Sequence, residues 1–165
     1  MTIDLDEKLY VFEVRKAAKE DTAAVEKITK EAFFKYCELA DLDYSIEALE
    51  ESGADIARDI ENKEVYVAFI DDIPVGSVRI EVLDGKRAYL SRFGVRMDYQ
   101  NSGIGKILMR AVDKAMKKNG VKRLELHTGA KVTDLVRFYY SRGFYIADVD
   151  YDRGYPRALL VKEYE

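Results

Sequence analysis

Strand-like and helix-like patterns of apolar residues alternate along the chain, and together they predict an α/β fold built on a mixed sheet. Seven stretches have the pattern of strands: residues 11–17, 64–70, 75–83, 87–95, 123–128, 144–149 and 158–164. Four have the pattern of helices: they begin at Asp21, at Ser45 and after residue 105, and the last spans residues 132–141. The resulting order, β-α-α-β-β-β-α-β-α-β-β, places helices on both faces of one sheet and includes a βαβ crossover from 87–95 to 123–128.

The prediction of the first two helices rests on their capping residues and on the helical spacing of apolar residues. Asp21 and Ser45 are favourable N-caps, and apolar residues recur after each of them on one helical face. These residues are Val25, Ile28, Ala32, Phe33 and Tyr36 in the first helix, and Ile46, Leu49, Ile56 and Ile60 in the second. Asp84-Gly85 predicts a hairpin turn between two strands of the meander.

Size and composition favour one domain, expected over residues 11–165 after an N-terminal extension of residues 1–10. The net charge of −4 argues against a general nucleic-acid or anionic-membrane partner, and no apolar run reaches the ~18 residues of a membrane span. The charged start of the chain is unlike a signal peptide. The single cysteine, Cys37, predicts a buried thiol in a cytoplasmic protein, and with one histidine it excludes a Cys/His zinc site.

Residues 100–106, Gln-Asn-Ser-Gly-Ile-Gly-Lys, lie between a predicted strand and a predicted helix. Unpaired N–H groups and the helix dipole attract phosphate at such a position, and glycines let the backbone approach it closely. The loop is not a Walker A sequence, because Gln100 and Ile107 replace its first Gly and its Ser/Thr. It is not a dinucleotide fingerprint either, because Leu108 replaces the third Gly. Taken by itself, the loop fits phosphate binding and a tight strand-to-helix turn equally well.

Two segments around this loop resemble the hallmarks of the GNAT (Gcn5-related N-acetyltransferase) superfamily. Gln100, Gly103 and Gly105 match the Arg/Gln-x-x-Gly-x-Gly/Ala core of its motif A, and an apolar helix follows. Downstream, residues 138–144, Phe-Tyr-Tyr-Ser-Arg-Gly-Phe, are similar to the Tyr-x-x-x-Gly-Phe segment that closes the family's last helix. The resemblance covers nearly the whole chain and implies the GNAT-like acyl-CoA N-acyltransferase fold.

The resemblance also implies acetyl-CoA as the cofactor. In the family, the two strands corresponding to 87–95 and 123–128 splay apart, and the pantetheine arm of the cofactor lies between them. Residues 93–95 would offer backbone groups to pantetheine, with Gly94 at a bulge, and residues 100–106 would wrap the pyrophosphate. The side chain of Ile104 is expected to point into the core. The implied cofactor-binding residues are Phe93, Gly94, Val95, Gln100, Asn101, Ser102, Gly103, Ile104, Gly105 and Lys106.

The implied reaction is direct attack of a primary amine on the thioester. Such an amine, with a pKa of about 10.4, must lose a proton before it attacks, and the leaving thiolate must gain one. Tyr139 aligns with the family's general acid, and a tyrosine with a pKa of about 10 stays protonated at neutral pH. The alternative is a core tyrosine in an aromatic helix, in which case Tyr140 is the next candidate donor.

The sequence leaves the general base open among Glu81, Glu125, His127 and water, because each of these side chains also fits an ordinary solvated or paired strand residue. One position departs from the family pattern. Family members often carry an asparagine that contacts the cofactor seven residues before the acid tyrosine, and Val132 stands there.

The resemblance places the acceptor pocket between the first two helices and the last hairpin. Ten acidic residues lie in that helical region: Glu31, Glu38, Asp41, Asp43, Glu47, Glu50, Glu51, Asp55, Asp59 and Glu61. They either attract a cationic small-molecule or peptide amine or simply solvate two helices. The loop 150–157 mixes aromatic residues with both signs of charge and either lines the pocket or is an ordinary hairpin. The expected function is N-acetyl transfer, with a homodimer as a candidate assembly; the alternative is a non-catalytic acyl-CoA-binding module.

Overall fold

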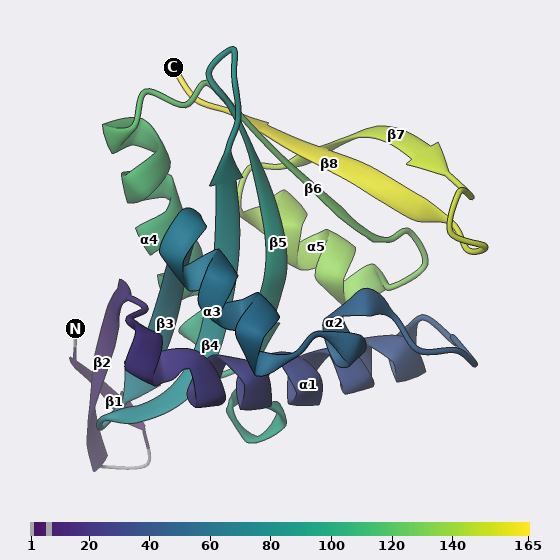
Figure 1. Cartoon of the computed structure of the whole chain (residues 1–165). Helices are drawn as coiled ribbons and strands as arrows, with labels where there is room; N and C mark the ends of the chain where they lie inside the picture. Colours follow the sequence, from purple (N-terminus) through teal and green to yellow (C-terminus); the bar gives the residue numbers. More distant parts are fainter. Residues whose placement is uncertain (1, 6–7) are drawn as a thin grey trace.

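A single eight-stranded sheet forms the centre of the computed structural model, which describes residues 2–5 and 8–165 (Figure 1). The strand order is β1-β2-β3-β4-β5-β6-β8-β7. Among the described strands, β5 and β6 pair in parallel and the other neighbours pair antiparallel. The strands are β1 (Thr2–Leu5), β2 (Lys8–Lys16), β3 (Glu64–Ile70), β4 (Ile73–Val82), β5 (Arg87–Val95), β6 (Arg123–Gly129), β7 (Tyr145–Asp150) and β8 (Arg157–Glu163). All seven predicted strands are present with ends shifted by at most a few residues, and β1 is added at the N-terminal edge.

Helices cover both faces of this sheet, as the predicted mixed α/β class requires. They are α1 (Thr22–Leu39), α2 (Glu47–Glu50), α3 (Gly53–Asn62), α4 (Ile104–Lys118) and α5 (Thr133–Ser141). Side chains alternate between the two faces of a strand, so Val67 of β3 packs with α1 and α3 while its neighbour Ala68 packs with the α4 side. The buried residues Ile104, Leu108 and Val112 put one face of α4 into the larger of these two cores. In the described residues, no helix is long and apolar enough to cross a membrane.

The prediction of one helix beginning at Ser45 is wrong, because the chain forms two helices there. Ser52 starts the second of them: its hydroxyl accepts a hydrogen bond from the Asp55 N–H at 3.2 Å, and the Asp55 carboxylate accepts one from the Ser52 N–H at 2.9 Å. This reciprocal capping box gives α3 its own beginning and separates it from the single turn of α2. The N-cap of that turn is Ile46, whose side chain makes no capping bond.

Asp21 precedes α1 as predicted, but its carboxylate does not cap that helix. It accepts hydrogen bonds from the Arg15 guanidinium at 2.8 Å and from the Ala18 N–H at 2.7 Å instead. Asp21 therefore fixes the turn between β2 and α1. The predicted burial of Cys37 is confirmed, since 9% of the residue is exposed.

Strands β5 and β6 separate after three paired positions, which opens the sheet in its middle. The pairing ends at Tyr89 opposite Glu125, although β5 continues to Val95 (Figure 1). In addition, β5 bulges against β4, because Ser77 pairs with Gly94 and Arg79 with Ser91, leaving two residues opposite one. The splayed strands therefore leave backbone groups of residues 90–95 without a partner strand on the β6 side.

The bulge is not at Gly94, as the sequence suggested, but at Arg92 and Phe93. Arg92 has a φ of 52°, in the left-handed region, which fits the backbone distortion of a bulge. Gly94 has another role: a Cβ added there would lie 2.7 Å from the Cβ of Ala32 in α1. Because real Cβ atoms do not approach that closely, glycine lets α1 rest directly on β5 beside the opening.

Candidate functional site

The loop before α4 presents a run of backbone N–H groups at the helix N-terminus. Among the described residues, the N–H groups of residues 101–106 have no hydrogen-bond acceptor in the chain, and the first amide of this region that does is Ile107, which donates to the Gly103 carbonyl at 3.1 Å. Asn101 and Gly103 adopt left-handed conformations, with φ of 64° and 90°. This geometry gives a concave loop whose amides and helix dipole attract an anion.

Side chains of the same loop hold its shape. The Gln100 amide donates to the Val95 carbonyl at 3.1 Å, and the Ser102 hydroxyl donates to the Tyr99 carbonyl. Ile104 is 1% exposed and lies in the core, as predicted. The loop is thus held by side chains that turn toward the protein, and its amides are left for a ligand.

A cavity of about 470 Å³ runs along this loop, and we call it the glycine-loop groove. Eight of the ten implied cofactor-binding residues line it: Phe93, Gly94, Val95, Gln100, Asn101, Gly103, Gly105 and Lys106. Ser102 and Ile104 are not among its lining residues, which agrees with the inward direction of their side chains. A Cβ at Gly105 would lie 3.3 Å from the Phe138 ring, so glycine keeps this part of the groove open.

The backbone of β5 contributes to the same groove through Val95. The Arg96 N–H donates to the Val75 carbonyl of β4 at 2.8 Å. Val95, the residue before Arg96, lies opposite Gly76 of β4. Hydrogen bonds in an antiparallel pair alternate between the two sides of a strand, so the N–H of Val95 points away from β4. It therefore faces the opening between β5 and β6, where a ligand group could accept a hydrogen bond from it.

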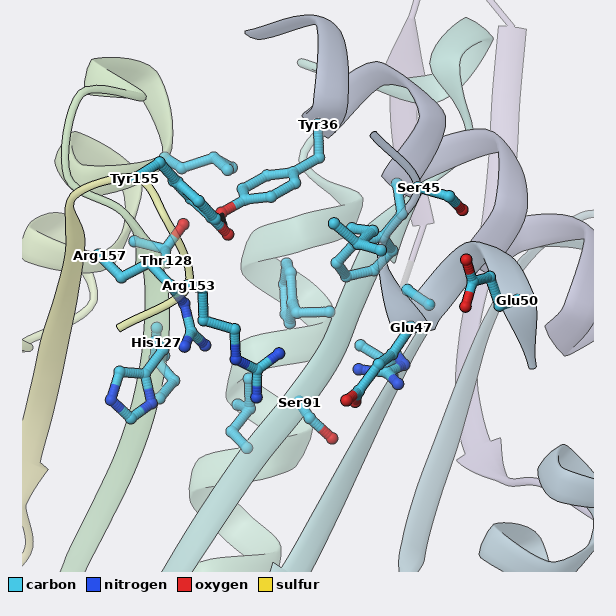
Figure 2. Close-up of a pocket in the computed structure, with 18 of the residues that line it drawn as sticks. Tyr36, Ser45, Glu47, Glu50, Ser91, His127, Thr128, Arg153, Tyr155 and Arg157 are labelled. Atoms are coloured by element: carbon cyan, nitrogen blue, oxygen red, sulfur yellow. Dashed lines mark hydrogen bonds between the residues drawn. The ribbon is translucent and has the colours of Figure 1, made fainter. Parts of the chain in front are cut away.

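A second cavity, also of about 470 Å³, lies between the splayed strands, and we call it the inter-strand pocket (Figure 2). Its walls come from α1, α2 and the segment between them, from β5, β6, α5 and β8, and from the β7–β8 loop. The two cavities share four lining residues, Phe33, Tyr36, Phe93 and Leu135. The two cavities therefore adjoin one another at the bulge of β5.

Tyr139 lies in the wall of the inter-strand pocket near this junction. It is 5% exposed, and its ring packs edge-on against those of Phe138 at 5.3 Å, Phe144 at 5.6 Å and Phe93 at 6.0 Å between centroids. Burial raises the pKa of Tyr139 above its usual value, so the hydroxyl keeps its proton at neutral pH. Tyr140, the alternative donor, is 52% exposed and is not a lining residue of either cavity.

The three candidate bases have different surroundings. His127 lines the inter-strand pocket, and its Nδ1 shares a hydrogen bond of 2.6 Å with the Tyr89 hydroxyl. Burial and the nearby Arg157 lower the pKa of His127, so its imidazole is neutral at pH 7.

The two carboxylates are less suited to accept a proton here. Although burial opposes it, hydrogen bonds from Arg123 and Arg87 hold the pKa of Glu125 below its usual value. The exposed Glu81 lies 3.9 Å from Lys63, and neither carboxylate lines the two cavities. Of the three, His127 is the one that the fold brings to the site.

Half of the predicted acidic rim has other partners. Five of its ten members form salt bridges within the protein: Glu31, Glu38, Glu51, Asp55 and Asp59. Two others, Glu47 and Glu50 of α2, line the inter-strand pocket. Glu51 and Asp59 accept hydrogen bonds from the buried Arg79 guanidinium, at 2.8 and 3.0 Å, and so tie α2 and α3 to β4.

Several pocket residues were not singled out from the sequence. The hydroxyls of Tyr36 and Tyr155 share a hydrogen bond of 2.9 Å that joins α1 to the β7–β8 loop above the pocket (Figure 2). Arg153 and Arg157 line the pocket from the same loop and from β8. The mixed aromatic and charged composition of residues 150–157 was the available signal, but it could not show which way these side chains point.

Comparison with known proteins agrees with this geometry. The sequence model of the acetyltransferase (GNAT) family matches residues 23–144. Spermidine N(1)-acetyltransferase of Thermoplasma acidophilum is 26% identical over 147 residues, which cover 84% of this chain and 91% of the relative.

Two solved structures share the fold. The PaiA N-acetyltransferase of T. acidophilum, in complex with coenzyme A, has a TM-score of 0.81 at 24% identity, and the match covers 93% of this chain and 99% of the other. A putative acetyltransferase of Salmonella typhimurium, solved with acetyl-CoA, has a TM-score of 0.76 at 15% identity, with 94% and 95% covered. The predicted GNAT-like fold is thereby confirmed.

Proposed function

Because the chain belongs to the acetyltransferase (GNAT) family, we propose that it transfers an acetyl group from acetyl-CoA to a primary amine of a small molecule in the cytoplasm. Family membership makes it an acyl-CoA-dependent N-acetyltransferase with acetyl-CoA as cofactor. The relative named as a spermidine N(1)-acetyltransferase supports a small-molecule amine as the acceptor. We also propose a role for each of the residues around the two cavities.

The junction of the two cavities carries this proposal. The glycine-loop groove would hold the diphosphate on the amides of residues 101–106, and the pantetheine arm would follow residues 93–95 into the opening between β5 and β6. The thioester would then reach Phe93 and Leu135, where the inter-strand pocket begins. An amine in that pocket could attack the thioester carbonyl without any rearrangement of the strands.

Each proton and charge in this reaction has a candidate group. The neutral imidazole of His127 takes the proton of the amine, directly or through a water molecule. The Val95 N–H stabilises the oxyanion of the tetrahedral intermediate. Tyr139, a tyrosine that is protonated at neutral pH, donates its proton to the leaving thiolate of coenzyme A.

Release of free thiol from acetyl-CoA, measured against a panel of primary amines, tests the proposal. We expect thiol release that depends on the amine and that forms the N-acetyl product in equal amount. Binding of acetyl-CoA without thiol release for any amine would favour the non-catalytic module, and absence of binding would contradict both functions.

A further inference from the structure

The inter-strand pocket carries charges of opposite sign on opposite walls. Arg153 and Arg157 contribute guanidinium groups from the β7–β8 loop and β8, while Glu47 and Glu50 contribute carboxylates from α2. Figure 2 shows Arg153 reaching into the pocket toward the side where Glu47 and Ser91 face the same space. The two walls are about a hundred residues apart in sequence and meet only in the folded protein.

The Arg157 guanidinium lies beside the Tyr89 hydroxyl and the His127 imidazole, which are neutral groups. Among the described residues, none of the four charged side chains on these walls forms a salt bridge within 4.0 Å, either across the pocket or with another side chain. The neighbouring Arg92 differs, because its guanidinium lies 3.6 Å from Glu51, which also accepts hydrogen bonds from Arg79. Arg92 is therefore neutralised by a carboxylate of the protein. The two arginines on one wall of the pocket and the two glutamates on the other wall are not.

Two guanidinium groups that line one pocket repel a ligand that is only cationic, and they favour one that carries an anion. A guanidinium binds a carboxylate through two parallel N–H···O bonds, which fix the orientation of the ligand. The carboxylates of α2 favour an ammonium group at the other end. A polyamine would satisfy the α2 wall alone and would place further positive charge near Arg153.

Resting on the proposed function, we propose that the acceptor is a small amine that also carries a carboxylate, of the amino acid type. Its carboxylate binds Arg153 and Arg157, and its amine lies on the side of Glu47 and Ser91, next to the β5 bulge where the thioester arrives. A cavity of about 470 Å³ is adequate for such a molecule. Of the acidic residues between Glu31 and Glu61, Glu47 and Glu50 thus form one wall of a pocket that carries both signs of charge.

The test uses acceptor pairs that differ in the carboxylate. Lysine is compared with cadaverine, which lacks the carboxylate, and with lysinamide, in which the carboxylate is neutralised; spermidine is the polyamine reference. We expect kcat/KM for lysine to exceed that for cadaverine by at least about tenfold, in line with the strength of charge-assisted hydrogen bonds. The difference should appear in KM more than in kcat, because the carboxylate is bound equally in ground and transition states.

The variant Arg153→Gln should remove most of this preference by raising KM for lysine, so that the ratio of kcat/KM for lysine to that for cadaverine falls toward one. Arg58→Gln, an equal change at an exposed residue of α3, is the matched control and should keep the preference. Turnover of cadaverine or spermidine equal to that of lysine in the wild type would overturn the inference while leaving the transferase function in place.

A binding measurement separates this inference from failure of the enzyme reaction. Calorimetry with lysine and with cadaverine on the protein saturated with coenzyme A does not require turnover. Tighter binding of lysine that is lost in Arg153→Gln supports the inference even if no thiol is released, in which case the proposed function alone fails. Equal or undetectable binding of the two ligands contradicts the inference.

Discussion

The glycine-loop groove and the inter-strand pocket are neighbouring cavities of the same volume, but the chain builds them in different ways. The part of the groove that we propose to bind the diphosphate comes from one short segment, residues 100–106, and the groups that it offers are backbone amides. The pocket comes from helices, strands and loops spread along the chain from α1 to β8, and the groups that it offers are side chains. The groove depends on where the backbone bends, and the pocket depends on which residues the fold brings together.

This difference has a consequence for specificity. Backbone amides are unchanged by most substitutions, so a groove made of them keeps the same ligand while the rest of the chain varies. In the proposed function, the choice of acceptor depends on charged side chains of the pocket such as Arg153 and Glu47. We therefore expect substitutions in the groove to act on cofactor binding and substitutions in the pocket to act on the choice of acceptor.

Gly105→Glu should have the largest effect and should abolish coenzyme A binding. The new carboxylate would stand at the first turn of α4, against Phe138 and beside the diphosphate. Two like charges about 4 Å apart repel by roughly 4 kcal/mol near a protein surface, which corresponds to about a thousandfold loss of affinity. Isothermal calorimetry measures this loss.

The matched control for that variant is Gly53→Glu. It makes the same change at the first position of another helix, α3, where an added Cβ meets nothing closer than 3.8 Å. Thermal unfolding of both variants shows whether each is folded. Full affinity in a folded Gly105→Glu variant would contradict the assignment of the loop.

Tyr139→Phe should lower kcat by about a hundredfold or more, the usual contribution of a positioned general acid, with little change in coenzyme A affinity. The phenylalanine ring keeps the packing against Phe93, Phe138 and Phe144, so the variant should remain folded. Steady-state thiol release gives kcat, and Tyr140→Phe at the exposed neighbour is the control. Equal rates in wild type and Tyr139→Phe would remove Tyr139 from the mechanism.

Gly94→Ala should cost about 1–3 kcal/mol of unfolding free energy, as is typical of overpacking, because the new Cβ would lie 2.7 Å from that of Ala32. The double variant Ala32→Gly with Gly94→Ala tests this contact, because it lacks the Ala32 Cβ with which the new Cβ would clash. Urea denaturation should show the double variant losing less stability than the sum of the two single variants. Simple additivity would show that α1 does not rest on β5 through this pair.

His127→Gln should have the smallest effect, a loss of about tenfold in kcat/KM, because water can also carry the proton. Burial lowers the pKa of His127, so the free base is present at pH 7 and is lost only as the pH falls below the usual histidine value of about 6.5. The pH–rate profile of the wild type should therefore fall on the acid side, and that fall should be absent in the variant. A fall at the same pH in both proteins would assign it to another group.

Much of the fold could be predicted because its signals are local. The strand at 64–70, the Asp84-Gly85 turn and the inward side chain of Ile104 follow from periodicity and turn chemistry, and all three are present. The break between α2 and α3 was missed although Ser52 and Asp55 form a capping box, because the apolar spacing around it suggested one continuous helix.

The two parts of the site also differ in how far local sequence predicts them. Gly103 and Gly105 mark the loop in the sequence because their backbone conformation is local, and the family resemblance then favours phosphate binding over a simple turn. The bulge at Arg92 depends on the register with β4, and the charges of Arg153 and Glu47 meet only after the whole sheet has formed. Neither the register of β5 with β4 nor the meeting of these two charges can be predicted from one segment of the sequence alone.

The most direct test of the account is a titration of the ¹⁵N-labelled chain with coenzyme A, followed by NMR. The account predicts that the backbone amides of residues 101–106 and of Val95 change most in chemical shift, and that they gain protection from hydrogen exchange once the cofactor binds. Small changes at these amides, with the largest changes elsewhere, would contradict the claim that the loop before α4 clasps the diphosphate.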